Sequence, residues 1–144
     1  MQAWLCDNPI GVEALRWTAM PTPAPGPGQV RIAVHAASLN FPDLLTVQGK
    51  YQIRPPLPFV PGSECSGTVE AIGDGVRHLG AGDRVATIGV AGGFATHACV
   101  DAARVMRLPP GVDLEDAAAF AFTYGTSHHA LIDRAALQAG ETVL

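Results

Sequence analysis

The chain of 144 residues is 48% hydrophobic and 15% charged, and this balance excludes an intrinsically disordered protein. Its net charge of -4 provides no basic surface of the kind that binds nucleic acid. The longest apolar run, Ala117–Phe122, is shorter than the roughly 20 residues that a membrane span needs, so no membrane partner is expected.

The cysteines and the start of the chain indicate the cellular compartment. Cys6, Cys65 and Cys99 are too few and too widely spaced for a disulfide scaffold, which favours a reducing environment. No charged segment followed by an apolar one opens the chain, so no signal peptide is expected. We therefore expect a cytoplasmic protein with a substantial hydrophobic core.

Most of the chain consists of short predicted strands separated by Gly- and Pro-rich turns. The clearest is Gln29–Ala37, where Val30, Ile32, Val34 and Ala36 alternate with other residues, as in a half-buried strand. This spacing is typical of a barrel or a sandwich. The predicted strands are Met1–Leu5, Glu13–Trp17, Gln29–Ala37, Ser66–Ile72, Arg84–Val90, Phe94–Val100 and Arg104–Pro109.

The stretch Ser38–Gly67 carries polar side chains among apolar ones and two proline clusters, a composition that favours the wall of a pocket. A short helix is predicted over Asp43–Val47, because Pro42 suits a first helical turn and Gly49 suits the position after the helix end. The prolines between 54 and 62 exclude a helix or a central strand there.

The character of the chain changes after Pro110. Asp113 is predicted to cap a helix over Leu114–Phe120, and a second helix is predicted to begin at Thr123 or Thr126 and to end near Leu137. The last residues, Glu141–Leu144, are predicted to begin a strand. We therefore expect a fragment of a longer protein, with one unit at 1–112 and a connecting unit at 113–144.

Motifs for several other chemistries are missing. The segment Gly73-x-Gly75-x-x-His78 lacks the third glycine of a dinucleotide fingerprint, and a turn between strands is the better interpretation. There is no P-loop, nucleophile elbow or HExxH motif. Cys65 has no cysteine or histidine partner nearby in the sequence, so a buried structural thiol is expected.

Four segments carry a family resemblance: NFPDLLTVQGKY, PLPFVPGSECSGTVEAIGDGV, GDRV and GGFATHACV. In this order and spacing they resemble the N-terminal domain of zinc-independent, zeta-crystallin-like quinone oxidoreductases of the medium-chain alcohol dehydrogenase superfamily. The resemblance implies a mainly β fold with short helices, a GroES-like and partly open β-barrel. Its C-terminal helices would lead into a Rossmann domain that binds NADPH and lies beyond Leu144.

Three positions separate this chain from zinc-dependent members of that superfamily. Asn40 and Ser63 stand where those members have a ligand cysteine and a ligand histidine, and Phe122 falls near the third ligand. An amide, a hydroxyl and a phenyl group are not zinc ligands of this type. No four-cysteine lobe lies between Val90 and Leu108. The resemblance therefore implies NADPH as cofactor and no metal.

The resemblance also implies site residues. Asn40 and Tyr51 would be catalytic and would contact the cofactor, and Thr126 would face the nicotinamide. The alternatives are a helix cap for Asn40 and for Thr126, and an amphipathic rim residue for Tyr51. We expect three polar residues, Asp43, Ser63 and Glu64, to hold the wall through hydrogen bonds. Three apolar ones, Phe41, Leu44 and Phe59, are expected to belong to the core, with the lining of an apolar acceptor pocket as the alternative.

The expected function is hydride transfer from NADPH to a quinone or an α,β-unsaturated carbonyl compound, with a small-molecule substrate as the main partner. The isolated chain is expected to be inactive and monomeric, and the full-length protein to be a homodimer. One alternative is an enoyl reductase module of a larger synthase, which the methionine directly before the first strand disfavours. The other is a non-catalytic GroES-like barrel, either a chaperonin-like ring subunit or a binding module.

Overall fold

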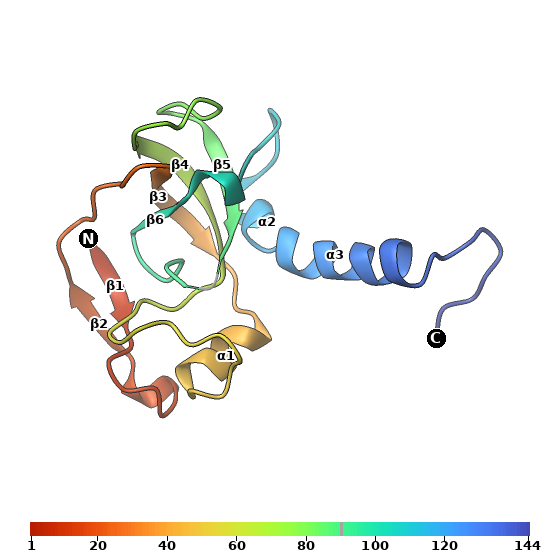
Figure 1. Ribbon diagram of the computed structural model, residues 1–144, viewed down its shortest axis with the longest axis horizontal. Helices are drawn as coiled ribbons and strands as arrows, with labels where there is room; N and C mark the ends of the chain where they lie inside the picture. The colour runs from red at the N-terminus through yellow and green to blue at the C-terminus, as the bar shows by residue number, and fades with distance from the viewer. Residues whose placement is uncertain (90) are drawn as a thin grey trace.

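Two antiparallel sheets organise the fold in the computed structural model, which describes residues 1–89 and 91–144 (Figure 1). A two-stranded sheet has the order β1-β2, and a five-stranded sheet has the order β6-β3-β4-β5-β7. The strands are β1 (Gln2–Leu5), β2 (Arg16–Ala19), β3 (Gln29–Ala37), β4 (Glu64–Ile72), β5 (Arg84–Ile88), β6 (His97–Asp101) and β7 (Val105–Arg107). The last residue of the predicted strand Arg84–Val90 lies outside the described residues.

The core lies on one face of the large sheet. Val30 and Ile32 of β3 are fully buried, and they pack in one cluster with Val69 of β4 and Val85 of β5. The alternation predicted for β3 is therefore correct at its start. Further along, Val34 and Ala36 are only half-buried, beyond an irregularity in the β3–β4 register.

The sheets do not close into a complete barrel. The large sheet ends at β6 on one side and β7 on the other, and isolated bridges join the small sheet to the rest: Ala3 pairs with Ala95, and Cys6 pairs with Phe59. The predicted partly open, mainly β architecture is confirmed.

The second predicted strand is wrong in its first half. Val12–Ala14 form a 3-10 turn, and the strand begins only at Arg16, because its partner strand begins pairing at Leu5. β4 starts earlier than predicted, at Glu64 rather than at Ser66. The last predicted strand is shorter than expected, since a second 3-10 turn covers Ala102–Arg104.

Helix α1 (Phe41–Val47) follows β3 and matches the short helix predicted in this stretch, beginning slightly earlier. Gly49 has a φ of 65°, and its N–H donates to the carbonyl of Thr46, while the N–H of Lys50 donates to Leu45. These two bonds form the reversal that glycine permits after a helix. The helix end was predictable from the sequence for this reason.

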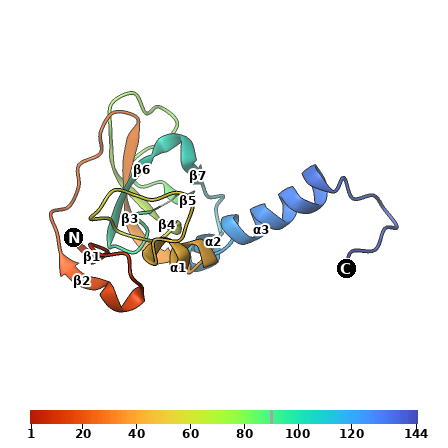
Figure 2. The same ribbon diagram turned by 60° about the horizontal axis from the view of Figure 1, so that its bottom comes forward.

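The C-terminal helices are α2 (Leu114–Ala118) and α3 (Ala121–His128), followed by a π-helical segment at His129–Arg134. Asp113 caps α2 as predicted, accepting from the N–H of Glu115 at 2.7 Å. α2 packs against the large sheet, whereas α3 has no buried residue and extends away from the sheets in both views (Figures 1 and 2).

Three expectations for this end of the chain have different outcomes. α3 begins at Ala121, so a start at Thr123 or Thr126 is wrong. Glu141–Leu144 form no strand with any described residue, because an isolated strand has no ladder to join. The division of the chain at residue 112 stays a prediction. No helix among residues 1–89 and 91–144 has the length and apolar character needed to cross a bilayer.

The close approach of β3 and β4 at Gly67 leads to a prediction. A Cβ atom at Gly67 would lie 2.0 Å from the Ala33 carbonyl oxygen, and the backbone cannot move away without breaking the ladder. We expect Gly67→Ala to lower the free energy of unfolding by about 3 kcal/mol, measured by urea unfolding. The matched control is Gly80→Ala, where the nearest atom to a Cβ is 3.8 Å away, and a change within about 0.5 kcal/mol is expected. Equal effects of the two variants would contradict the steric argument.

Candidate functional site

Asp43 ties helix α1 to the start of β4. Its side chain is 4% exposed, one carboxylate oxygen accepts from the Asn40 N–H at 2.9 Å, and the other accepts from the Ser63 N–H at 2.8 Å. The first bond closes the first turn of the helix, where backbone N–H groups lack helical partners. The second fixes the helix against the loop before β4. Asp43 therefore holds the wall of the site, as predicted.

Glu64 joins a second pair of segments. Its carboxylate is 1% exposed, and its Oε1 accepts from the backbone N–H of Phe122 at 2.7 Å. Its Oε2 accepts from the Ser38 hydroxyl at 2.6 Å and from the Asn40 amide nitrogen at 3.4 Å. Burial of a carboxylate is tolerated only when such donors replace water. The predicted wall-holding role is correct for this residue also.

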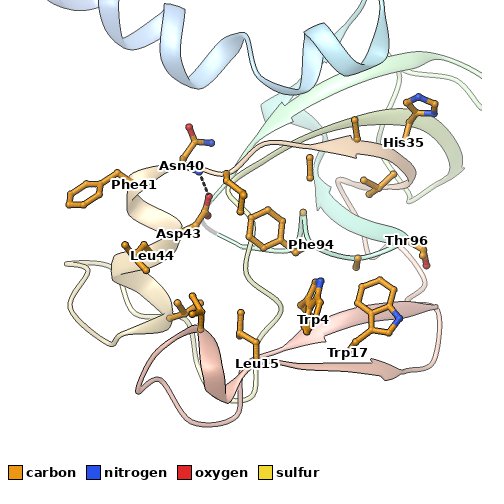
Figure 3. A pocket seen from close by; sticks show the side chains of 18 residues that line it. Trp4, Leu15, Trp17, His35, Asn40, Phe41, Asp43, Leu44, Phe94 and Thr96 are labelled. Atoms are coloured by element: carbon orange, nitrogen blue, oxygen red, sulfur yellow. Dashed lines mark hydrogen bonds between the residues drawn. The ribbon is translucent and has the colours of Figure 1, made fainter.

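The Asn40 amide takes part in this chain of bonds through its nitrogen. Asn40 Nδ2 donates to Ser38 Oγ at 2.9 Å, and Ser38 Oγ donates in turn to Glu64. Asn40 also occupies the N-cap position of α1 and takes part in a capping box with Asp43, so the cap interpretation is correct, while its site role stays a prediction. In Figure 3 the side chain leaves α1 on the side of the C-terminal helices. The network leaves the amide oxygen of Asn40 outside these bonds.

An apolar groove of about 820 Å³ lies between α1, β3 and the β1-β2 sheet (Figure 3). Asn40 and Asp43 are at one end of it, and the tilted pair Trp4 and Trp17, with ring centroids 5.4 Å apart, is at the other. Phe94 lies between these ends. Tyr51 and Thr126 are not among the residues that line the groove.

The predicted site residues are thus only partly brought together. Asn40 is linked through Ser38 and Glu64 to Phe122, one helical turn from Thr126. Thr126 lies in the middle of α3, and its hydroxyl donates to the Phe122 carbonyl at 2.6 Å, so the helix-cap alternative is wrong. Tyr51 lies half-buried beyond the end of α1, and among the described residues no hydrogen bond joins its side chain to the other two.

The predictions for the remaining wall and core residues have different outcomes. Phe59 is buried and belongs to the core, as expected. Phe41 is 72% exposed and Leu44 is 41% exposed, so the core interpretation is wrong for both, and both line the groove. Their helix turns its Asp43 face inward instead. The Ser63 hydroxyl is buried without a hydrogen-bond partner among the described residues, although its N–H is bound by Asp43.

Two parts of the network could not be found from the sequence. Ser38 is an ordinary serine at the end of a strand, and Phe122 contributes only its backbone N–H. The signal that was available is Glu64, a charged residue inside an otherwise uncharged run from residue 55 to 69. A charge in such a run requires buried partners, but the sequence does not say which.

Cys65 behaves as a structural thiol. Burial, and secondarily the neighbouring Glu64 carboxylate, raise the pKa of the Cys65 thiol to about 12. A thiol of that pKa supplies almost no thiolate near neutral pH and is a poor nucleophile. Among residues 1–89 and 91–144, no group of three or more His, Cys, Asp or Glu side chains is placed to hold a metal ion.

Comparison with known proteins identifies a family and shows how much of each relative the chain covers. Residues 26–110 match the family model described as the alcohol dehydrogenase GroES-like domain. The chain is 44% identical over 120 residues to a quinone oxidoreductase-like protein 2 homolog of Nematostella vectensis, covering 83% of the chain and 33% of that relative. It is also 43% identical over 117 residues to a reducing polyketide synthase of Cochliobolus heterostrophus, covering 81% of the chain and 4% of the synthase.

Solved structures match almost the whole chain. A human synaptic vesicle membrane protein VAT-1 homolog-like protein has a TM-score of 0.92 at 36% identity, covering 97% of this chain and 45% of that one. The quinone oxidoreductase of Thermus thermophilus, whose structure was also determined with NADPH, has a TM-score of 0.83 at 34% identity, covering 98% and 43%. These names agree with the resemblance inferred from the sequence motifs. The chain spans less than half of each protein described.

The Asp43 contacts lead to a prediction about stability. Asp43→Asn keeps the shape but has one acceptor oxygen for two N–H groups, so one of them faces an NH₂ group in a buried site. We expect the free energy of unfolding to fall by about 1–3 kcal/mol in urea unfolding followed by circular dichroism. Asp74→Asn, in the exposed turn after β4, is the control and should change it by less than about 0.5 kcal/mol. An unchanged free energy of unfolding in Asp43→Asn would contradict the anchoring role.

The raised pKa of Cys65 predicts a pH dependence. The unfolded thiol ionises near its ordinary value of 9.0 and the folded thiol near about 12, so the native state holds the extra proton between these values. The contribution of this group is complete below about pH 9 and is lost as pH rises toward about 12, by at most ~1.4 kcal/mol per pH unit. Urea unfolding of the wild type and Cys65→Ala between about pH 8 and about pH 10.5 should show the steeper decline in the wild type. Parallel declines would show that the thiol does not contribute.

Proposed function

Because the chain belongs to the alcohol dehydrogenase GroES-like domain family, we propose that it forms the substrate-side part of an NADPH-dependent reductase. The substrate is a quinone or an α,β-unsaturated carbonyl compound, which accepts a hydride without a metal ion. The chain spans only 33% of the Nematostella relative, so the segment that binds most of the NADPH belongs to the remaining length. That segment would be a Rossmann domain, which binds the dinucleotide at the ends of its parallel strands.

The hydrogen-bond chain at Asn40 is the observation that supports this proposal. Ser38 and Glu64 accept from Asn40 Nδ2, so Oδ1 is the atom that can accept from a ligand. A carboxamide N–H group, as in nicotinamide, is a donor that fits this acceptor. The Thermus thermophilus quinone oxidoreductase structure with NADPH supports the choice of cofactor for a protein of this fold.

The bound cofactor would supply the hydride, and a proton from water would complete the two-electron reduction of the acceptor. The residues of this chain would then position and polarise. Asn40 would hold the carboxamide in place, and the hydroxyl of Tyr51 would donate a hydrogen bond at the acceptor oxygen. The Thr126 hydroxyl donates its proton to the Phe122 carbonyl, so its oxygen would accept a hydrogen bond from the cofactor. The amide of Asn40 and the hydroxyl of Ser63 make this wall unsuited to zinc.

A second candidate is an enoyl reductase module of a larger synthase. The 43% identity to a reducing polyketide synthase supports it. The two functions differ in their acceptor, since a synthase module reduces an enoyl thioester carried on a long arm, whereas a stand-alone enzyme takes a free quinone or enone. Relative kcat/KM for 1,4-benzoquinone and for a crotonyl thioester separates them.

Three further properties belong to the same proposal. The full-length protein would be a cytoplasmic homodimer, with the contacts between subunits made mainly outside this chain. The 144-residue chain alone would then be a monomer. Light scattering coupled to size-exclusion chromatography distinguishes these states, and a dimer of the chain alone would contradict this part of the proposal.

The proposed function predicts a difference between the chain and the full-length protein. The full-length protein should oxidise NADPH in the presence of 1,4-benzoquinone or an enone, followed by absorbance, and the 144-residue chain alone should not. Asn40→Ala in the full-length protein should lower kcat/KM about tenfold, because one hydrogen bond to the cofactor is lost. Asn8→Ala, in an exposed turn, is the matched control. Robust turnover by the chain alone, or none by the full-length protein, would overturn the proposal.

A further inference from the structure

Glu64 is placed between the two elements that carry the proposed site. Its backbone is fixed by the large sheet, since it pairs with Ile88 of β5 and its carbonyl accepts from the Ser38 N–H at 3.3 Å. Its side chain is the only large polar one among the fully buried side chains of the described residues. A side chain placed in this way has little freedom to move, so its two carboxylate oxygens are held in fixed positions.

One oxygen of Glu64 determines how the Asn40 amide is oriented. Asn40 Nδ2 donates a hydrogen bond to Ser38 Oγ, and Ser38 Oγ donates in turn to Glu64 Oε2. Because a carboxylate only accepts, the Ser38 proton points to Glu64, and the Ser38 lone pairs then accept from the Asn40 NH₂ group. A reversed amide would turn its oxygen toward Glu64. The carboxylate thus selects the orientation in which Oδ1 lies on the side of the amide away from Ser38 and Glu64.

The other oxygen acts as the missing cap of α3. Phe120 at the N-cap position offers no side-chain acceptor, and Glu64 replaces it from a position 58 residues away in the chain by accepting the Phe122 N–H. A negative charge at a helix N-terminus is favourable. The carbonyl of Phe122 accepts the Thr126 hydroxyl, so Thr126 is anchored to the same residue. α3 has no buried residue of its own, so the hydrogen bond from Phe122 to Glu64 is a substantial part of its attachment to the large sheet.

We propose that Glu64 is a positioning residue that couples Asn40 to the N-terminus of α3, so that one buried carboxylate holds both walls of the reductase site. The effect of this coupling on the reaction rests on the proposed function, whereas the coupling itself does not. It requires no chemistry of Glu64 itself, because no atom of the carboxylate is exposed to a ligand. Glu64 thus has two hydrogen-bond arms, an Asn40 arm through Oε2 and a Phe122 arm through Oε1. They can be tested separately, because Ser38 takes part in the Asn40 arm only.

Hydrogen exchange measured by NMR on the 144-residue chain tests the coupling without any assay of activity. Glu64→Gln, with one acceptor oxygen, should speed exchange about tenfold at the Phe122 amide and at the Asn40 side-chain NH₂. Ser38→Ala should speed exchange at Asn40 and leave Phe122 unchanged. Glu70→Gln, on the same strand but exposed, is the matched control and should change neither. If Glu64→Gln does not fold, Ser38→Ala still tests the Asn40 arm.

Kinetics of the full-length protein then test the role in the reaction. We expect Glu64→Gln and Ser38→Ala to lower kcat about tenfold with the KM for the quinone unchanged, because misplacing Asn40 affects orientation rather than substrate binding. Unchanged exchange in both variants would overturn the coupling. Unchanged kinetics beside an impaired Asn40→Ala would overturn the positioning role alone. Wild-type protein that does not oxidise NADPH would overturn the proposed function, while the exchange data would still decide the coupling.

Discussion

A carboxylate that is 1% exposed can be tolerated only if donors replace the water it has lost, and Glu64 meets this condition with three donors from two separate segments. They are the short connection between β3 and α1, which supplies Ser38 and Asn40, and the first turn of α3. Because the carboxylate belongs to a strand of the main sheet, the sheet determines where the more exposed segments lie.

Asp43 applies the same principle to α1. The helix is short and exposes Phe41 and Leu44, and Val47 is its one buried large apolar side chain, so a polar attachment supplements its apolar packing. The buried carboxylate of Asp43 closes its first turn and bonds it to Ser63, directly before Glu64. Two acidic side chains from adjacent parts of the fold therefore organise one wall. The result is a polar edge at Asn40 next to a groove that is apolar as far as Trp4 and Trp17.

Much of the fold and of the family was predictable from the residues. Period-2 alternation located β3, proline and glycine bounded α1, and Asp113 marked the start of α2, because each of these signals acts through local backbone chemistry. The resemblance to quinone oxidoreductases is confirmed by relatives with that name. Local signals failed at α3, where the capping group is Glu64 on a distant strand. They failed at Phe41 and Leu44 because apolarity does not reveal which face of a short helix is buried.

The sequence by itself determined the approximate positions of the strands though not all of their ends, the two best-capped helices, the family and the presence of a charge inside an apolar run at Glu64. Those features depend on residue type, local spacing and motif order, all of which are written in the chain. Only the tertiary structure decided what that charge binds, which way the Asn40 amide faces, and that Thr126 lies within α3 rather than at its cap. These depend on which segments meet across the sheet, and a buried acceptor takes whichever donors the folded backbone brings within reach.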